Sequence, residues 1–143
     1  MAAVEPVRVL FICIGNTCRS PMAEAMAQAM GGGRLVAASA GVAPTGRVAP
    51  LTRATLESLG YSSAGLRSKG LDEVPLQACD LIVSLAGEEG LRFLPAVAGR
   101  TRAWRIPDPF GEEEDVYLAV ARLIERRVRA LVAEIDQMEP GAG

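Results

Sequence analysis

Two largely apolar runs, residues 7–12 and 81–85, dominate the hydrophobic pattern of the chain. Both are rich in β-branched residues, and runs of this length and composition are typical of buried strands. Residues 34–38 and 101–106 fit two further, shorter strands. The sequence therefore predicts four strands.

Helical patterns lie between and after these strands. The first one opens with Ser20 and Pro21, residue types that favour a helix start, and three consecutive glycines beginning at Gly31 stop it. The last one places apolar residues at helical spacing. The predicted helices cover residues 22–30, 50–59, 71–78, 88–94 and 113–137.

Strands that alternate with helices indicate an α/β fold, in which helices cover both faces of a parallel sheet. We expect a single domain over residues 1–143, with an ordered core of about residues 7–137 and a frayed tail at 139–143. We predict a four-stranded sheet with the order 2-1-3-4. In that order the loop after the first strand lies at the topological switch point, where such folds bind ligands.

The loop after the first strand, residues 13–19, is called the cysteine loop below. Gly15 and Asn16 tolerate left-handed backbone angles, so successive N–H groups of the loop can converge on one point and bind an anion. The helix that follows adds the positive end of its dipole. The residues of the predicted phosphate cradle are Ile14, Gly15, Asn16, Thr17 and Cys18.

Cys13 and Arg19 stand at the two ends of this loop. A thiolate is favoured by a helix N-terminus, by a nearby arginine and by hydrogen-bond donors, and Cys13 would have all three. Arg19 can reach back over the cradle and bind two phosphoryl oxygens. Ser20, which we place with the phosphate-binding residues, can donate its hydroxyl to the sulfur. The loop therefore predicts nucleophilic attack on phosphorus by Cys13.

Composition narrows the function classes. The chain has 143 residues, half of them hydrophobic, and a formal net charge of −2. This charge argues against nucleic acid or an anionic membrane as the main partner. Three cysteines and no histidine do not supply a typical structural zinc site or a disulfide framework. We therefore expect no metal and no cofactor. No signal peptide or membrane span is visible, so we expect a cytoplasmic protein. We expect it to be a monomer or a weak dimer.

The cysteine loop resembles the hallmark loop of the low-molecular-weight protein-tyrosine phosphatases, and three further segments strengthen the likeness. Met22-Ala23-Glu24 is similar to the family's continuation of the loop, Ser39-Ala40-Gly41 to a segment after its second strand, and Asp108-Pro109-Phe110 to its late Asp-Pro-aromatic signature. The likeness runs from about residue 7 to about residue 136. It implies hydrolysis of a phosphoprotein through a cysteinyl-phosphate intermediate.

The resemblance gives Asp108 a catalytic role. In the family this residue is the general acid that protonates the leaving group and then the base that activates water, so it must carry a proton before the first step. On spacing alone, an Asp before a proline is more often a turn residue. Phe110 would line the mouth of the pocket, or would serve only as a hydrophobic plug.

The resemblance also implies a hydrogen-bond network that holds the loop, with Asn16, Ser20 and Ser39 as supporting residues. The family network often includes a histidine, and this chain has none. Leu66 stands at the corresponding position. We therefore expect the rigidity of the loop to differ from that of the family.

Four functions stay open, with phosphotyrosine hydrolysis first. The second is phosphoarginine hydrolysis. The family usually carries an aliphatic residue where this chain has Thr17, and the combination of Thr17 with Phe110 is similar to the bacterial protein-arginine-phosphatase branch. A threonine hydroxyl can hydrogen-bond the guanidinium of phosphoarginine. An arsenate reductase shares this scaffold, but its disulfide relay needs two further cysteines and only Cys79 follows the loop. A non-catalytic phosphate-binding module is the fourth.

The second cysteine of the loop has two possible roles. Cys18 either forms a protective disulfide with Cys13 or is a small buried filler.

Overall fold

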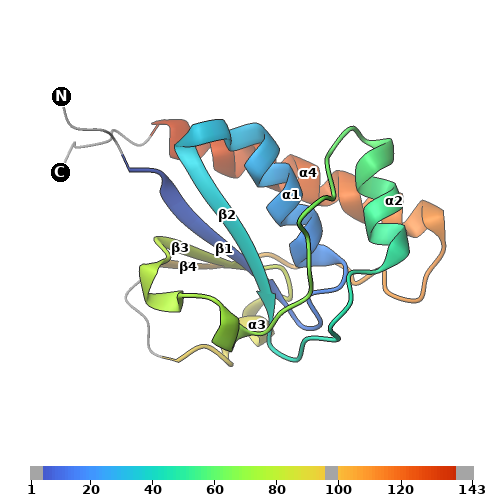
Figure 1. Cartoon of the computed structure of the whole chain (residues 1–143), viewed down its shortest axis with the longest axis horizontal. Coiled ribbons are helices and arrows are strands. Elements are labelled where there is room, and N and C mark those ends of the chain that lie inside the picture. Colours follow the sequence, from blue (N-terminus) through green and yellow to red (C-terminus); the bar gives the residue numbers. More distant parts are fainter. Residues whose placement is uncertain (1–4, 96–99, 138–143) are drawn as a thin grey trace.

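Four parallel strands form the central sheet of the computed structural model, which describes residues 5–95 and 100–137 (Figure 1). The strands lie in the order β2-β1-β3-β4, as predicted, and each neighbouring pair is parallel. Their bounds are Val7–Cys13 for β1, Leu35–Gly41 for β2, Leu81–Ser84 for β3 and Arg100–Ala103 for β4. The α/β fold class and the strand order are therefore confirmed.

Helices connect the strands and close the chain. The first of them begins at Arg19, one residue before the predicted opening at Ser20, and it ends where predicted because Gly32 leaves the helix with a φ of +56°. The α-helices are α1 (Arg19–Gly31), α2 (Pro50–Ser58), α3 (Glu88–Leu91) and α4 (Glu114–Gln137), with a 3-10 turn η1 (Gly32–Arg34) after α1.

One predicted helix, over residues 71–78, is wrong. Two separate 3-10 turns, η2 (Leu71–Glu73) and η3 (Leu76–Ala78), occupy this segment. Pro75 lies between the turns, and a proline inside a helix removes a backbone hydrogen bond and clashes with the preceding turn. The segment therefore stays close to the sheet without forming a continuous helix.

The fourth strand is shorter at its end than the predicted range of 101–106. It stops at Ala103, but the chain stays attached to the β3 side, since Trp104 N donates to Ser84 O at 2.7 Å and Ile106 N donates to Leu85 O at 3.3 Å. These two bonds place the chain that follows β4 beside the end of β3. The predicted tail at 139–143 lies outside the described residues.

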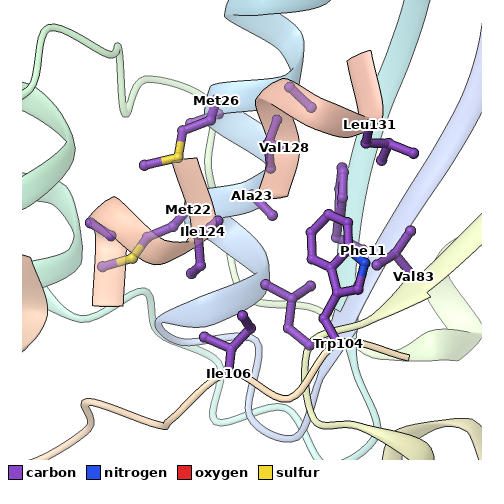
Figure 2. Close-up of a cluster of buried hydrophobic side chains, with 14 of the residues drawn as sticks. Phe11, Met22, Ala23, Met26, Val83, Trp104, Ile106, Ile124, Val128 and Leu131 are labelled. Atoms are coloured by element: carbon purple, nitrogen blue, oxygen red, sulfur yellow. The ribbon is translucent and has the colours of Figure 1, made fainter. Parts of the chain in front are cut away.

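Helices α1 and α4 cover one face of the sheet. Figure 2 shows the sheet side chains of this face meeting the apolar side chains of the two helices. The labelled members of this buried cluster are Phe11, Met22, Ala23, Met26, Val83, Trp104, Ile106, Ile124, Val128 and Leu131. On the other face Leu10, Ile12 and Ile82 pack against residues of η2, η3 and α3.

Because both faces are covered, the ends of the strands are the place where polar side chains can gather. The cysteine loop begins at Cys13, the last residue of β1, and enters α1 at Arg19. It therefore lies at the carboxyl end of a strand whose two neighbours are β2 and β3, which is the predicted position. Among the described residues, no helix is both long and apolar enough to cross a bilayer.

Candidate active site

The cysteine loop is anchored through its carbonyl groups. Its carbonyl oxygens accept hydrogen bonds from backbone N–H groups of the segment that follows β2. The pairs are Val42 N to Cys13 O at 3.1 Å, Ala43 N to Ile14 O at 2.9 Å, Thr45 N to Gly15 O at 3.0 Å and Ala49 N to Thr17 O at 3.1 Å. The loop is thus fixed along one side.

The N–H groups of the same loop are left for a ligand. Within the part of the chain that the structure describes, no protein atom accepts a hydrogen bond from the backbone N–H groups of residues 14–18. Helix α1 starts directly behind them, so its dipole adds positive potential at the same point. Such an arrangement can bind an oxyanion.

Gly15 and Asn16 shape the loop for different reasons. Asn16 adopts the predicted left-handed conformation, with a φ of +50°, which asparagine tolerates well. Gly15 does not, so that prediction is wrong for Gly15. A Cβ atom on Gly15 would lie 3.1 Å from Cγ2 of Thr45 and 3.2 Å from Oγ1 of Thr17, so a larger residue there would press on both threonine side chains.

Cys13 is buried at the start of the loop, and its Sγ lies 2.8 Å from Oγ of Ser20. Ser20 does not cap α1, because the helix already begins at Arg19 and no side chain caps it. The Ser20 hydroxyl is instead directed at the sulfur. A hydroxyl in this position can donate to a thiolate, and a hydrogen bond to a charged group is stronger than one to a neutral group.

Arg19 is held by two backbone carbonyls from the ends of neighbouring strands. Its Nη1 donates to Leu85 O at 3.2 Å and to Ile106 O at 2.9 Å. Its Nη2 lies 3.7 Å from Oδ2 of Asp108. The guanidinium is buried, so these contacts fix its direction and leave its outer edge for a bidentate contact with an oxyanion.

One pocket of about 190 Å³ brings the predicted catalytic side chains together. Asp108 stands at its rim on the loop after β4, with 52% of its side chain exposed, and its Oδ1 accepts a hydrogen bond from Phe110 N at 3.1 Å. Phe110 is 62% exposed and lines the same pocket. The lining consists of Cys13, Ile14, Gly15, Thr17, Cys18, Arg19, Ala43, Thr45, Asp108 and Phe110.

Thr17 has hydrogen-bond partners inside the wall of this pocket. Its Oγ1 lies 3.1 Å from Gly15 O, to which it can donate, and 2.5 Å from Oγ1 of Thr45. Thr45 also lies 3.1 Å from Arg47 O. The Thr17 hydroxyl is therefore already engaged by loop atoms.

Cys18 lies in the same pocket wall, and its thiol is also buried. Burial raises the pKa of Cys18, while a contact of 3.5 Å between its sulfur and the hydroxyl of Tyr117 lowers it in part. The balance favours the neutral thiol at Cys18.

The chain matches the family described as low molecular weight phosphotyrosine protein phosphatase over residues 8–140. It belongs to that family. A low molecular weight protein-tyrosine-phosphatase of Streptomyces coelicolor is 34% identical, over 94% of this chain and 96% of that protein. The protein-arginine-phosphatase of Bacillus subtilis is 28% identical, over 90% of this chain and 97% of that protein.

Solved structures extend the comparison. An arsenate reductase from Archaeoglobus fulgidus is 39% identical, with a TM-score of 0.78 over 87% of this chain and 98% of that chain. Proteins similar to this chain therefore carry the names of three activities. Membership of the phosphatase family limits the chemistry to phosphate or arsenate, and it does not show which of the three activities this protein has.

The structure also shows how this phosphatase-family loop is supported. Asn16 Nδ2 donates to Oγ of Ser20 at 2.8 Å and to Oγ of Ser39 at 3.0 Å. Leu66, expected at the histidine position, lies in the hydrophobic core and makes no polar contact with the loop. Ser68 and Lys69 do so instead, because Ser68 Oγ donates to Gly15 O at 3.1 Å and Lys69 N donates to Asn16 Oδ1 at 2.8 Å.

Sequence reasoning missed three residues that contact this loop, Ser68, Lys69 and Gly41. It also missed Glu24, which contacts Ser39 and Lys69 behind the loop. Ser68 and Lys69 are far from the loop along the chain, so no local pattern marks them. Gly41 and Glu24 stand inside segments that resemble the family, and a test of these segments for contacts with the loop and with its supporting residues could have found them. No group of three or more metal-ligating side chains gathers within residues 5–95 and 100–137.

Proposed function

We propose that this protein is a cysteine-dependent protein phosphatase that hydrolyses phosphotyrosine in a phosphoprotein through a cysteinyl-phosphate intermediate. The observation that carries the proposal is that one pocket holds Cys13, Arg19 and Asp108 together, over the free N–H groups of the cysteine loop. A module that only binds phosphate would need the loop and Arg19, but it would not need a carboxyl group facing them.

In the first step the phosphoryl oxygens bind the loop N–H groups and Arg19. The Cys13 sulfur attacks phosphorus, the bond between phosphorus and the tyrosine oxygen breaks, and Asp108 gives its proton to that oxygen. In the second step a water attacks the cysteinyl phosphate while Asp108 takes the water's proton. The bond between sulfur and phosphorus breaks, inorganic phosphate leaves, and Cys13 is again a thiolate that Ser20 stabilises.

Two exposed apolar side chains favour an aromatic leaving group. Ile14 is 37% exposed and Phe110 is 62% exposed, and both line the pocket. Large apolar side chains exposed beside a pocket are typical of ligand-binding surfaces. Their positions suit contact with the ring of phosphotyrosine while its phosphate lies in the loop.

Phosphoarginine is the second candidate substrate, on one observation. Thr17 places a hydroxyl in the pocket wall, where an oxygen could accept a hydrogen bond from a guanidinium. However, this hydroxyl already contacts Gly15 O and Thr45 Oγ1. We therefore keep phosphotyrosine first.

The position of the third cysteine, Cys79, argues against arsenate reduction through a disulfide relay within one chain. Leu81 pairs with Val9, so Cys79 lies level with Val7, six residues before Cys13 along β1. Strands rise by about 3.3 Å per residue, which separates the two cysteines by roughly 20 Å. A disulfide needs Cα atoms within about 7 Å, so Cys79 cannot join a relay with Cys13 in this fold.

Substitution of the nucleophile tests the proposal. Cys13→Ser should bind phosphate but retain less than about one hundredth of the wild-type rate on a phosphotyrosine peptide, because a serine hydroxyl is scarcely ionised at neutral pH. Phosphoarginine peptide, and arsenate with glutaredoxin or thioredoxin, are assayed in parallel. Cys79→Ser is the matched control and should keep the wild-type rate.

Two results would overturn the proposal. Cys13→Ser with a tenth or more of the wild-type rate would show that Cys13 is not the nucleophile. Wild-type protein that reduces arsenate and leaves phosphotyrosine intact would assign the site to the arsenate reductases of the family.

A further inference from the structure

Polar side chains continue from Cys13 into the protein, away from the pocket. Hydrogen bonds join Cys13 Sγ to Ser20 Oγ at 2.8 Å, Ser20 Oγ to Asn16 Nδ2 at 2.8 Å, and Asn16 Nδ2 to Ser39 Oγ at 3.0 Å. Ser39 Oγ then donates to Oε1 of Glu24 at 2.5 Å. The chain of contacts ends at Lys69, whose Nζ lies 4.0 Å from the same carboxylate oxygen.

The donors and acceptors allow one direction through this chain. Lys69 N donates to Oδ1 of Asn16, which fixes the side-chain amide with its nitrogen toward the two serines. Ser39 gives its only proton to Glu24, so it can only accept from Asn16. Ser20 accepts the other proton of Asn16, so its own proton is left for the Cys13 sulfur. An ionised Glu24, which can only accept, sets this direction from the far end.

Glu24 is not in a place where a carboxylate ionises easily. It is 19% exposed, and burial raises its pKa, while the Ser39 hydroxyl and the Lys69 ammonium lower it in part. Lys69 is 12% exposed, so the ion pair is shielded from water more than a surface pair is. Loss of the ammonium would favour a protonated Glu24, whose O–H group would compete with the proton of Ser39.

We propose that Lys69 and Glu24 are positioning residues of the active site, a partly buried ion pair that acts through Ser39, Asn16 and Ser20 to direct a hydrogen bond at the Cys13 thiolate. Lys69 thereby supplies a positive group to a network that this chain builds without any histidine. This inference rests on the proposed role of Cys13 as the nucleophile.

The test measures the Cys13 thiolate without using phosphatase activity. Alkylation of Cys13 by iodoacetamide is followed against pH, with the modified residue located by mass spectrometry, so the readout stands even if phosphotyrosine is not the substrate. Lys69→Met should raise the midpoint of this pH dependence by about one unit, a tenfold change in the thiolate equilibrium. Lys69→Arg, which keeps the charge, should stay near the wild-type midpoint.

Matched variants separate the ion pair from a general loss of charge. Arg67→Met removes the neighbouring cation, which pairs with Glu73 on the surface, and should leave the midpoint unchanged. The double variant Glu24→Gln/Lys69→Met has the same formal net charge as the wild type. It should shift the midpoint no further than Lys69→Met alone, because the two residues act as one unit.

Ser39→Ala cuts the chain of hydrogen bonds in the middle without a change of charge, and it should raise the midpoint as Lys69→Met does. If Lys69→Met does not fold, the midpoint of Ser39→Ala tests the inference in its place. Midpoints that stay within about 0.3 units of wild type in the folded variants, even with a lower melting temperature, would show a purely structural role and overturn the inference. An equal shift in Arg67→Met would also overturn it.

Discussion

Asp108 depends on its loop for its position. Its side chain is half-exposed, and its contact with the buried Arg19 is a long one, at 3.7 Å. Pro107 and Pro109 flank it, and the hydrogen bond from Phe110 N fixes one carboxyl oxygen. The other oxygen lies 3.7 Å from Arg19, so it faces the place where the leaving group would depart.

Asp108→Asn tests the general acid while it preserves this geometry. The asparagine oxygen can still accept the hydrogen bond from Phe110 N, but the side chain cannot deliver a proton at neutral pH. We expect turnover of a phosphotyrosine peptide to fall by roughly 10²–10⁴-fold. An aryl phosphate with an acidic phenol should slow much less, because its leaving group needs no proton. Equal slowing of both substrates in steady-state assays would contradict the assignment.

Thr17→Val tests whether the Thr17 hydroxyl decides between phosphotyrosine and phosphoarginine as the substrate. Valine has nearly the same shape, and Gly15 O keeps its hydrogen bonds from Thr45 N and Ser68 Oγ. We therefore expect phosphotyrosine turnover to change by less than about threefold. A selective loss of phosphoarginine turnover, by about tenfold or more relative to phosphotyrosine, would instead identify the protein as an arginine phosphatase.

At the scale of elements, the carboxyl end of β2 supports the cysteine loop by lying against it. A Cβ atom on Gly41 would lie 2.7 Å from Ile14 O and 2.8 Å from Asn16 N, both backbone atoms of the loop. Gly41 N also donates to Lys69 O at 2.8 Å, which joins β2 to the segment that carries Ser68 and Lys69. The strand, the loop and that segment can therefore pack only if position 41 has no side chain.

Gly41→Ala should move the loop and reduce activity without replacing any catalytic group. A displacement of about 1 Å in an active site can cost about 10²-fold, and we expect kcat/KM on phosphotyrosine to fall by that order. Gly33→Ala is the matched control, because a Cβ there meets no atom within 4 Å. A Gly41→Ala protein with wild-type kcat/KM would show that the loop tolerates the displacement.

The elements also show what the sequence could predict. The strands, the cysteine loop and the end of α1 follow from local patterns, since the spacing from Cys13 to Arg19 and the glycines after α1 act over a few residues. The strand order is not local, because β1 pairs with β3, and its prediction depends on the topology common to α/β folds. The pattern of segment 71–78 predicts one helix, but Pro75 divides it into two 3-10 turns. Ser68 and Lys69 escaped prediction because only folding brings them beside Asn16.

At the scale of the whole molecule, the parallel sheet separates the thiols by its direction. Cys13 and Cys18 lie in the loop at the carboxyl ends of the strands, while Cys79 precedes β3 at their amino ends. The same topology that gathers the site at one edge of the sheet therefore keeps Cys79 away from it. A disulfide within this chain at the site could therefore involve Cys13 and Cys18 but not Cys79.

Mild oxidation should join these two cysteines and leave the third one free. Peroxide would oxidise the Cys13 thiolate to a sulfenic acid, and the Cys18 sulfur would then attack the Cys13 sulfur, so that the disulfide forms and the sulfenic oxygen leaves as water. After trypsin, the peptide of residues 9–19 should be two hydrogens lighter and resistant to alkylation, while Cys79 still reacts. In Cys18→Ala the sulfenic acid has no partner thiol and is oxidised further to the irreversible sulfinic acid, so added thiol should restore activity in wild type and Cys79→Ser but not in Cys18→Ala. Full recovery of activity in Cys18→Ala would show that Cys18 is only a packing residue. A disulfide between Cys13 and Cys79 of one chain would contradict the prediction, because the sheet would have to open to bring these two cysteines together.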